Sequence, residues 1–383
     1  MPRKKRVAVL GATGSIGKIA LDVLERGRDD FEVVLLCARS DAEGLEEAGR
    51  LWPGATRVLA GAAGGRGLLL SAIAGCGADV VLNGISGAAG LEPSAAAIEA
   101  GCDLALANKE TLVMAGDLIT RRAREKNAEI IPVDSEHSAV HALIEAHGRS
   151  VVEEIVLTAS GGPFRNSTVE EMERALPGDA LAHPTWDMGS KISVDSASMA
   201  NKGLEVIEAA RLFGFPAAKI RVAVHPQSVV HSMVRTTDGA VYAQLSRPDM
   251  RHPIRRALYR GAPAGAGAPN GTGAADFGRL DFGPGFDGLT LEFFPPDAER
   301  FPLLAMAYEA AERGGLYPCA YNAANETAVR AYLSGRVGFL DIGRVTGYIM
   351  DTDWSAEPGD VAAVIEADSR AAAMAEEEIR CRW

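Results

Sequence analysis

Residues 6–17, RVAVLGATGSIG, decide the fold predicted for this chain. The apolar run VAVL has the length and composition of a buried strand, and the helical pattern IALDVLERG follows at 19–27. Between them lie Gly11, Gly14 and Gly17. A strand, a glycine turn and a helix in this order form the context of a dinucleotide-binding fingerprint. The spacing is GxxGxxG rather than GxGxxG, and the alternative is a tight turn that binds nothing.

The second predicted strand, FEVVLLCA at 31–38, is followed by Arg39 and Ser40. This is about 20 residues past the glycine turn, where an NAD-binding protein places an acid on the ribose. An arginine and a serine suit a 2′-phosphate instead, which predicts NADPH rather than NADH. Asp41 would reverse this preference if the register slipped, and Arg39 has the alternative of a solvated loop charge.

Strands then alternate with helices. The segments 78–84, 102–108 and 129–134 are predicted strands, and helical patterns lie between them. This alternation predicts a parallel sheet with right-handed crossovers, whose ligands bind at the carboxyl ends of the strands. The strand ends Gly11–Gly17, Gly84–Ser86, Asn108–Glu110 and Asp134–Glu136 are therefore expected to line one crevice.

The acids Asp134 and Glu136 are candidate ligands of a hard cation. If the segment is extended, their side chains point the same way. Glu205 is the best candidate for a third carboxylate, and an all-oxygen site suits Mg²⁺ or Mn²⁺ rather than zinc. The alternatives are a helix cap for Asp134 or Ser135, and for Glu205 a solvated position or a pair with Lys202.

Residues 183–205, HPTWDMGSKISVDSASMANKGLE, carry the densest polar chemistry of the chain. The first half has no hydrophobic period, so it is predicted to be neither a core helix nor a core strand, and helix is expected only from about Ser198. A polar loop with an aromatic tip that leads into a helix start suits an anion. This stretch is interpreted as the substrate grip.

The remainder of the chain is predicted to be α+β and then helical. Strands are expected over 153–159, 219–225, 228–236 and 240–246, the last two joined by a hairpin at Asp238-Gly239. The prolines at 248–253 break this pattern, and the Gly/Ala/Pro-rich segment 261–278 is interpreted as a linker. Four amphipathic helices after residue 301 suggest a small bundle, with Asn322 and Asn325 as packing or capping residues.

Composition narrows the function further. The chain has 383 residues and a net charge of −12, which argues against a nucleic-acid surface but not against a phosphorylated small molecule. No secretion signal, transit peptide or long apolar run is evident, so no membrane partner is expected. The five cysteines show no CxxC, which favours a reducing cytosol without disulfides or zinc. All seven histidines lie between His137 and His252.

Seven motifs resemble one known family. They are GATGSIG (11–17), LANKETLV (106–113), PVDSEHSA (132–139), SGGPFR (160–165), the stretch 183–205, HPQSVVHSMV (225–234) and PDMRHPI (248–254). In this order they resemble 1-deoxy-D-xylulose 5-phosphate reductoisomerases from residue 7 to about residue 255, and the C-terminal helices are similar to that family's bundle. The resemblance implies an α/β fold with a Rossmann-like NADPH-binding domain, a central α+β catalytic domain with a flap, and a C-terminal four-helix bundle.

The resemblance also implies domain bounds and residue roles. The bounds are 1–133 for NADPH binding, 134–260 for catalysis and dimerisation, 261–296 for a linker and 297–383 for the helical domain. The implied cofactor residues are Thr13, Gly14, Ser15, Ile16, Ala38, Arg39, Ser40, Asn108, Glu110 and Gly189. The implied metal ligands are Asp134, Glu136 and Glu205, which with Lys109 form the catalytic set. The implied substrate residues are Lys109, Ser135, Glu136, Ser160, His183, Ser196, Asn201, Lys202 and Glu205. The implied flap residues are His183, Trp186 and Met188, with His231 and Met250 near them.

The implied reaction is metal-assisted rearrangement of 1-deoxy-D-xylulose 5-phosphate by a retro-aldol and aldol sequence. NADPH then reduces the resulting aldehyde to 2-C-methyl-D-erythritol 4-phosphate, in isoprenoid precursor biosynthesis by the non-mevalonate pathway. The metal is Mg²⁺, Mn²⁺ or Co²⁺, and a homodimer in a bacterial cytoplasm is the family expectation. Thr185, Ser190 and Ala159 depart from the residues usual at these positions. Thr185 and Ser190 fall on the flap, so flap closure or affinity is put in doubt rather than the reaction type.

Two other classes of function compete with this prediction. A semialdehyde dehydrogenase also opens with a GxxGxxG turn, but it needs a reactive cysteine near a histidine. Cys102 lies inside an apolar strand and Cys319 in the helical tail, so neither position suits that role. An NADPH-binding regulator without catalysis would keep the first domain, but it has no reason to keep three carboxylates beside a phosphate-binding set.

Overall fold

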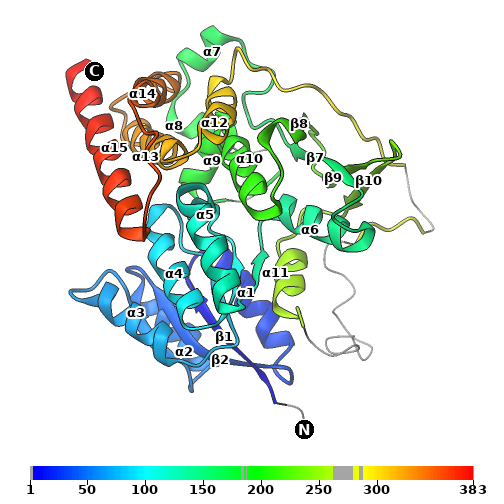
Figure 1. The fold of residues 1–383 in the computed structure, drawn as a ribbon, viewed down its shortest axis with the longest axis vertical. Coiled ribbons are helices and arrows are strands. Elements are labelled where there is room, and N and C mark those ends of the chain that lie inside the picture. The colour runs from blue at the N-terminus through cyan, green and yellow to red at the C-terminus, as the bar shows by residue number, and fades with distance from the viewer. Residues whose placement is uncertain (1–2, 183–184, 187, 262–278, 284–287, 383) are drawn as a thin grey trace. The chain divides into compact units, whose positions relative to one another are not determined.

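The N-terminal part of the chain is built around a six-stranded parallel sheet (Figure 1). The structure is a computed structural model that describes residues 3–182, 185–186, 188–261, 279–283 and 288–382. The strands are β1 (Lys5–Leu10), β2 (Phe31–Ala38), β3 (Thr56–Leu59), β4 (Val80–Asn83), β5 (Asp103–Leu106) and β6 (Ile130–Pro132). Their order is β3-β2-β1-β4-β5-β6, so the chain reverses its direction of travel between β1 and β4, the place where such sheets bind ligands.

Helices follow the strands of this part, and those after β1, β4, β5 and β6 lie where helical patterns were predicted, whereas the helices after β2 and β3 were not predicted. The helices of this part are α1 (Ser15–Arg26), α2 (Ala42–Leu51), α3 (Gly65–Gly75), the 3₁₀ turn η1 (Ala88–Gly90), α4 (Leu91–Glu99), α5 (Lys109–Lys126) and α6 (Ser135–His147). Strands such as β1 and β4 are buried along their apolar residues, which is why they read as apolar runs without alternation. The sequence prediction did not contain β3, because this short strand exposes Thr56 and Arg57.

Contacts between residues divide the chain into two compact units. Unit 1 comprises Met1–Thr111, Ile119–Ser138 and Asp249–Asp281, and unit 2 comprises Leu112–Leu118, Ala139–Pro248 and Phe282–Trp383. Helices α5 and α6 therefore contribute residues to both units, and α5 departs from helical geometry at Ala115.

Helix α11 (Arg251–Leu258) belongs to unit 1 together with most of the N-terminal residues. The predicted domain bounds place the same helix in the catalytic domain, residues 134–260. The prolines were expected to break the pattern, but Pro253 falls in the first helical turn, where proline is tolerated. The buried face of α11 includes Ile254 and Leu258, which join the core around α1 and β2. Just beyond the helix, the Tyr259 hydroxyl donates to Asp30 at 2.9 Å, which anchors it further.

Unit 2 contains a four-stranded mixed sheet in the order β10-β9-β7-β8. Its strands are β7 (Val152–Ala159), β8 (Ile220–Val224), β9 (Val230–Thr236) and β10 (Val241–Leu245). β8 is parallel to β7, whereas β9 is antiparallel to both β7 and β10. The predicted hairpin is confirmed, because Gly239 has a φ of 86° and the Ala240 amide donates to Asp238 Oδ1 at 3.1 Å.

The remaining helices of unit 2 include the four predicted at the C-terminus. They are α7 (Val169–Glu173), α8 (Pro177–Leu181), α9 (Ser190–Ala197), α10 (Ala200–Phe213), the 3₁₀ turn η2 (Ala217–Lys219), α12 (Pro302–Arg313), α13 (Tyr317–Leu333), α14 (Asp341–Met350) and α15 (Val361–Arg382). Helix α13 packs against α12, α14 and α15, and most of its residues are buried. Among the described residues, no helix combines the length and the apolar composition needed to cross a membrane.

One prediction about the stretch 183–205 was wrong. Helical structure begins before Ser198, because residues 190–197 form α9. The pattern was hidden because the buried face of α9 includes Asp195 and Ser193 beside Val194. Met199 has a φ of 61°, a left-handed conformation that separates α9 from α10 and is uncommon for a side chain of this kind.

Candidate active site

The glycine turn fits a pyrophosphate by its local geometry. Gly11 has a φ of +79°, and a Cβ there would lie 2.8 Å from the Gly84 carbonyl oxygen, so the turn packs tightly between β1 and β4. Gly14 is the N-cap of α1, no side chain in the described part of the chain caps this helix, and its first turn contains no acidic residue. The amide groups of this first turn are therefore offered to an anion. Gly14 and Ser15 are exposed, and Thr13 and Ile16 are partly exposed.

The carboxyl end of β2 carries the residues predicted to select the cofactor. Ala38 is buried, whereas Arg39 and Ser40 are exposed. Asp41, which left the choice of cofactor open, is the N-cap of α2, and its side chain accepts from the Gly44 amide at 2.9 Å. Because this carboxylate is used by the helix, Arg39 is the charged residue at the strand end that remains available for a ligand.

Asn108 has a structural role that the sequence did not reveal. It is the N-cap of α5 and is 2% exposed. Its amide nitrogen lies 2.7 Å from the Ile85 oxygen and 2.9 Å from the Gly87 oxygen, and its Oδ1 accepts from Thr111. Glu110 lies beside it, with Oε2 3.0 Å from the Asn108 nitrogen. The Asn108 side chain thus ties the end of β5 to the loop after β4.

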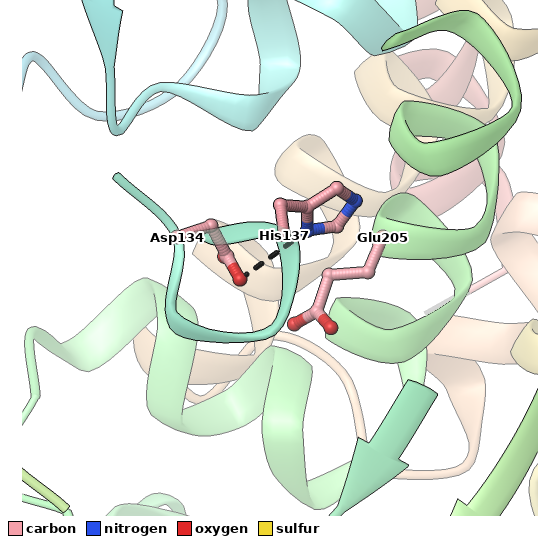
Figure 2. A group of neighbouring side chains, drawn as sticks. All are labelled: Asp134, His137 and Glu205. Carbon is pink, nitrogen blue, oxygen red and sulfur yellow. Dashed lines mark hydrogen bonds and ion pairs between the residues drawn. The ribbon is translucent and has the colours of Figure 1, made fainter. Parts of the chain in front are cut away.

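A buried lysine–carboxylate pair joins the carboxyl ends of β5 and β6. Lys109 Nζ lies 2.6 Å from Asp134 Oδ2, and the two side chains are 5% and 10% exposed. His137 Nδ1 lies 3.4 Å from Asp134 Oδ1, the hydrogen bond drawn in Figure 2. Burial alone would raise the pKa of Asp134, but the charge of Lys109 and the contact with His137 outweigh it and hold the pKa well below its usual range. Asp134 is therefore an ionised oxygen donor at neutral pH, which fits a hard divalent cation.

The segment Asp134–Glu136 is not extended, contrary to the assumption made from the sequence. Asp134 immediately precedes α6, and its Oδ1 also accepts from the Glu136 amide at 3.2 Å. The capping alternative is thus confirmed, without excluding a ligand role. Ser135 and Glu136 lie in the first helical turn, where the Ser135 hydroxyl donates to Glu136. His137 was missed, although an aspartate followed three residues later by a histidine at a helix start is a recognisable signal.

Glu205 is buried on α10 and bonded within its own helix. Its side chain is 1% exposed, Asn201 Nδ2 donates to Oε1 at 2.6 Å, and Lys202 Nζ donates to Oε2. Positions three and four residues apart share one face of a helix, which explains these contacts. The pair with Lys202 foreseen as an alternative is confirmed, and the solvated position is wrong. Figure 2 also draws Glu205, which belongs to unit 2.

Two candidate phosphate-binding segments touch in unit 2. Ser160 follows β7, and its Oγ accepts from the Gly162 amide at 3.2 Å. Gly162 has a φ of +67°, and a Cβ there would lie 2.7 Å from the Ser196 carbonyl oxygen. The loop after β7 therefore packs directly against the end of α9, which holds Ser160 and Ser196 on adjoining segments.

The predicted flap is described only in part. His183 lies outside the described residues. Trp186 and Met188 are partly exposed, and the Trp186 ring centroid lies 6.3 Å from that of His231, as expected for neighbours. Gly189 is the N-cap of α9, and its carbonyl accepts from the Ser193 amide at 3.1 Å.

The cysteines argue against a thiol-based mechanism. All five lie in the described part of the chain and are free of disulfides there. Burial raises the pKa of the Cys102 thiol to about 11 and raises the pKa of Cys319 further above its ordinary value. A thiol with a raised pKa is a poor nucleophile at neutral pH. Neither Cys102 nor Cys319 is therefore suited to be the nucleophile that the semialdehyde dehydrogenase alternative requires.

The fold and the site together define a dinucleotide-dependent oxidoreductase of the α/β class, with a lysine–carboxylate pair at the ligand-binding edge of its sheet. Three family models match the chain. The model for 1-deoxy-D-xylulose 5-phosphate reductoisomerase matches residues 7–61 and 51–116, and two models of the C-terminal domains of the same enzyme match 130–213 and 245–374. The chain belongs to the 1-deoxy-D-xylulose 5-phosphate reductoisomerase family.

Individual relatives agree over nearly the whole chain. The 1-deoxy-D-xylulose 5-phosphate reductoisomerase of Treponema pallidum (strain Nichols) is 45% identical, over 99% of this chain and 98% of the relative. The solved structure of the Zymomonas mobilis enzyme in complex with NADPH has a TM-score of 0.87 at 39% identity, covering 98% of this chain and 99% of that one. A DOX-P reductoisomerase in complex with NADPH, fosmidomycin and magnesium also has a TM-score of 0.87, at 32% identity and 98% coverage of both chains.

Proposed function

We propose that this chain converts 1-deoxy-D-xylulose 5-phosphate to 2-C-methyl-D-erythritol 4-phosphate, using NADPH and a divalent metal (Mg²⁺, Mn²⁺ or Co²⁺). The observation that carries the proposal lies in one sheet. The uncapped glycine turn after β1 and the buried pair of Lys109, after β5, with Asp134, after β6, all stand at carboxyl ends of parallel strands. Solved relatives in complex with NADPH and with magnesium support the same cofactors.

The carboxylates Asp134, Glu136 and Glu205 are proposed to hold the metal. When bound, the metal would polarise the substrate's ketone and neighbouring hydroxyl, and NADPH would supply the hydride. Lys109 and Ser135 are proposed to face the hydroxyl-bearing carbons. Lys109 already contacts Asp134 at 2.6 Å, which fixes its ammonium group for that purpose.

The substrate's phosphate is proposed to bind Ser160, Ser196, Asn201 and Lys202, with His183 contributing from the flap. Hydroxyl and amide donors with one ammonium group suffice for one phosphate dianion. Binding energy gained there, away from the reacting carbons, positions the rest of the substrate. Trp186 and Met188 are proposed to close over the bound molecule and exclude water, with Gly189 against the cofactor.

The cofactor is proposed to bind along the edge of the parallel sheet. Thr13, Gly14, Ser15 and Ile16 would hold the pyrophosphate, while Ala38, Arg39 and Ser40 would hold the 2′-phosphate end. Asn108 and Glu110 would contact the cofactor, while the Asn108 side chain also bonds the Ile85 and Gly87 carbonyl oxygens. This assigns residues 1–133 to cofactor binding, 134–260 to the metal and substrate, 261–296 to a linker, and 297–383 to the helical domain.

A homodimer in the bacterial cytoplasm is proposed for the working enzyme. The edge strand β10 exposes Val241, Tyr242 and Leu245, and the segment near β8 exposes Phe293 and Phe294. Contiguous patches of exposed apolar side chains mark protein–protein interfaces, so these residues are the candidates for the dimer contact. The bacterial origin of the relatives supports the location.

The proposal is tested by mixing the purified protein with NADPH, 1-deoxy-D-xylulose 5-phosphate and Mg²⁺ and following the absorbance of the reduced cofactor. We expect NADPH oxidation that stops with EDTA and returns when excess Mg²⁺ is restored. Oxidation that persists in EDTA would refute the metal site. NADPH binding without oxidation under Mg²⁺, Mn²⁺ or Co²⁺ would favour the alternative, an NADPH-binding regulator without catalysis.

Arg39→Ala tests the preference for NADPH. Loss of one charge-assisted hydrogen bond to a phosphate is expected to weaken NADPH binding by roughly tenfold or more while leaving NADH binding unchanged. Dissociation constants for both cofactors, measured by fluorescence at low and high salt, check this. Arg26→Ala, which removes another exposed arginine in the same unit, is the matched control. An equal loss of affinity for NADPH and NADH would show that Arg39 does not contact the 2′-phosphate.

A further inference from the structure

Helix α13 carries two asparagines in its fully buried interior. Asn322 and Asn325 are both 0% exposed, and their neighbours along the helix are chiefly alanine and tyrosine. A buried amide without hydrogen bonds costs free energy, so each position requires an explanation. Of the predicted packing or capping roles, capping is wrong for Asn325, because this residue lies in mid-helix, whereas its burial and its hydrogen bond to another element agree with a packing role.

That hydrogen bond reaches α9. Asn325 Nδ2 donates to Asp195 Oδ1 at 2.8 Å, across 130 residues of sequence. Asp195 is 1% exposed, and its other oxygen lies 2.8 Å from Lys191 Nζ, one turn earlier on α9. The carboxylate is thus held by an ammonium group of its own helix and by an amide of α13. A charge-assisted hydrogen bond in a dry interior is strong and sensitive to geometry.

Asp195 immediately precedes Ser196, whose main chain is fixed from the other side. Gly162, in the loop after β7, packs so closely against the Ser196 carbonyl oxygen that a Cβ at this position would lie 2.7 Å from it. One turn beyond, Met199 at φ 61° leads into α10, whose first turn carries Asn201 and Lys202. The end of α9 is therefore clamped between the loop that carries Ser160 and the Asn325–Asp195 bond.

We infer that Asn325 and Asp195 are positioning residues of the phosphate subsite, which act by fixing Ser196 relative to Ser160. The inference rests on the proposed function, since that assigns the phosphate to these serines. The amide of Asn325 acts as a donor, because its Nδ2 faces Asp195 Oδ1 at 2.8 Å, whereas its own Oδ1 has no hydrogen-bond partner among the described residues. An aspartate of the same shape would instead set two carboxylate oxygens against each other.

The test compares Asn325→Ala and Asn325→Asp with wild type in the full-length protein. Each variant is expected to raise KM for 1-deoxy-D-xylulose 5-phosphate about tenfold, because a displaced contact group loses binding energy. The value of kcat should change much less. The stabilisation by inorganic phosphate, measured as a shift in melting temperature, should shrink in parallel. The exchange pair Asn325→Asp with Asp195→Asn restores one donor and one acceptor and should recover part of the loss.

Asn322→Ala is the matched control. Asn322 is equally buried on the same helix, and its Oδ1 also lacks a partner in the part of the chain that the structure describes, but it donates to Glu326 of its own helix at 3.1 Å. Glu326 approaches Lys191 only at 4.0 Å, so the short contacts of Asp195 survive. This variant should lose stability without a change in KM. An unchanged KM in both Asn325 variants, while wild type turns over, would overturn the inference alone. Absence of turnover in wild type would instead overturn the proposed function.

Discussion

Replacing Asp134 with asparagine is expected to lower turnover by at least about a thousandfold, which corresponds to roughly 4 kcal/mol of transition-state stabilisation. The change removes a carboxylate whose pKa is held well below its usual range, so a negative charge is lost at every pH near neutrality. It also removes the charge that faces Lys109 at 2.6 Å. Breaking a buried ion pair by changing one partner costs about 3 kcal/mol or more in the free energy of unfolding.

A double variant separates these two effects. Asp134→Asn combined with Lys109→Met replaces both charges, and substitution of a whole buried pair is often close to neutral for stability. The double variant should therefore regain much of the melting temperature and none of the turnover. Asp22→Asn, in an exposed pair with Arg26, should change the free energy of unfolding by less than about 0.5 kcal/mol. Turnover of Asp134→Asn within tenfold of wild type would remove this residue from the proposed metal site.

The contribution of the Lys109–Asp134 pair to the stability of the fold depends on pH in a defined direction. Because folding lowers the pKa of Asp134, its contribution to stability is present above the unfolded pKa and is lost as the pH falls through the folded pKa. Comparing urea unfolding of wild type and Asp134→Asn across acidic pH should therefore show the two curves converging toward the acid end. A difference that grows on acidification would contradict the direction of the pKa shift.

The parallel sheet was predictable because its strands are buried on both faces and end in small or polar residues. The run VAVL and the glycine turn behind it needed no tertiary information, since their pattern reflects local geometry. The same holds for the C-terminal helices, whose apolar residues recur at helical spacing. β3 escaped because Thr56 and Arg57 are exposed, so its segment shows no apolar run.

The candidate site residues were named from the sequence, but the sequence did not reveal their geometry. Asp134 and Glu136 were predicted to point the same way from an extended segment, and the assumption of an extended segment was wrong, because the chain turns into α6 at Ser135. α9 was missed since Asp195 occupies its buried face, and a buried carboxylate resembles a surface residue in the sequence. Its partner Asn325 lies 130 residues away, a distance over which periodicity carries no information.

Gly17→Ala is expected to abolish tight NADPH binding, with a loss of affinity of about a hundredfold. A Cβ at Gly17 would lie 2.1 Å from the Gly11 carbonyl oxygen and 2.6 Å from the Ala12 Cα. Both are backbone atoms, so neither can rotate away, and α1 would have to shift relative to β1. The shift would displace the first-turn amides that face the proposed pyrophosphate, and overpacking of this kind also costs about 1–3 kcal/mol of stability.

Two other glycines separate the fold from the ligand in this prediction. Gly67 lies within α3, and a Cβ added there would meet no described atom within 4 Å, so Gly67→Ala should gain up to about 1 kcal/mol of stability and bind NADPH normally. At Gly14 a Cβ would meet the Gly11 oxygen at 3.4 Å, an ordinary contact, yet this residue is exposed at the start of α1. Gly14→Ala should therefore keep the melting temperature of wild type but weaken NADPH binding, since the methyl group stands where the pyrophosphate would approach. Calorimetric titration of the three variants with NADPH decides the matter. If Gly14→Ala binds NADPH as wild type does, the glycine turn serves only the packing of α1 on β1, and the cofactor must bind elsewhere.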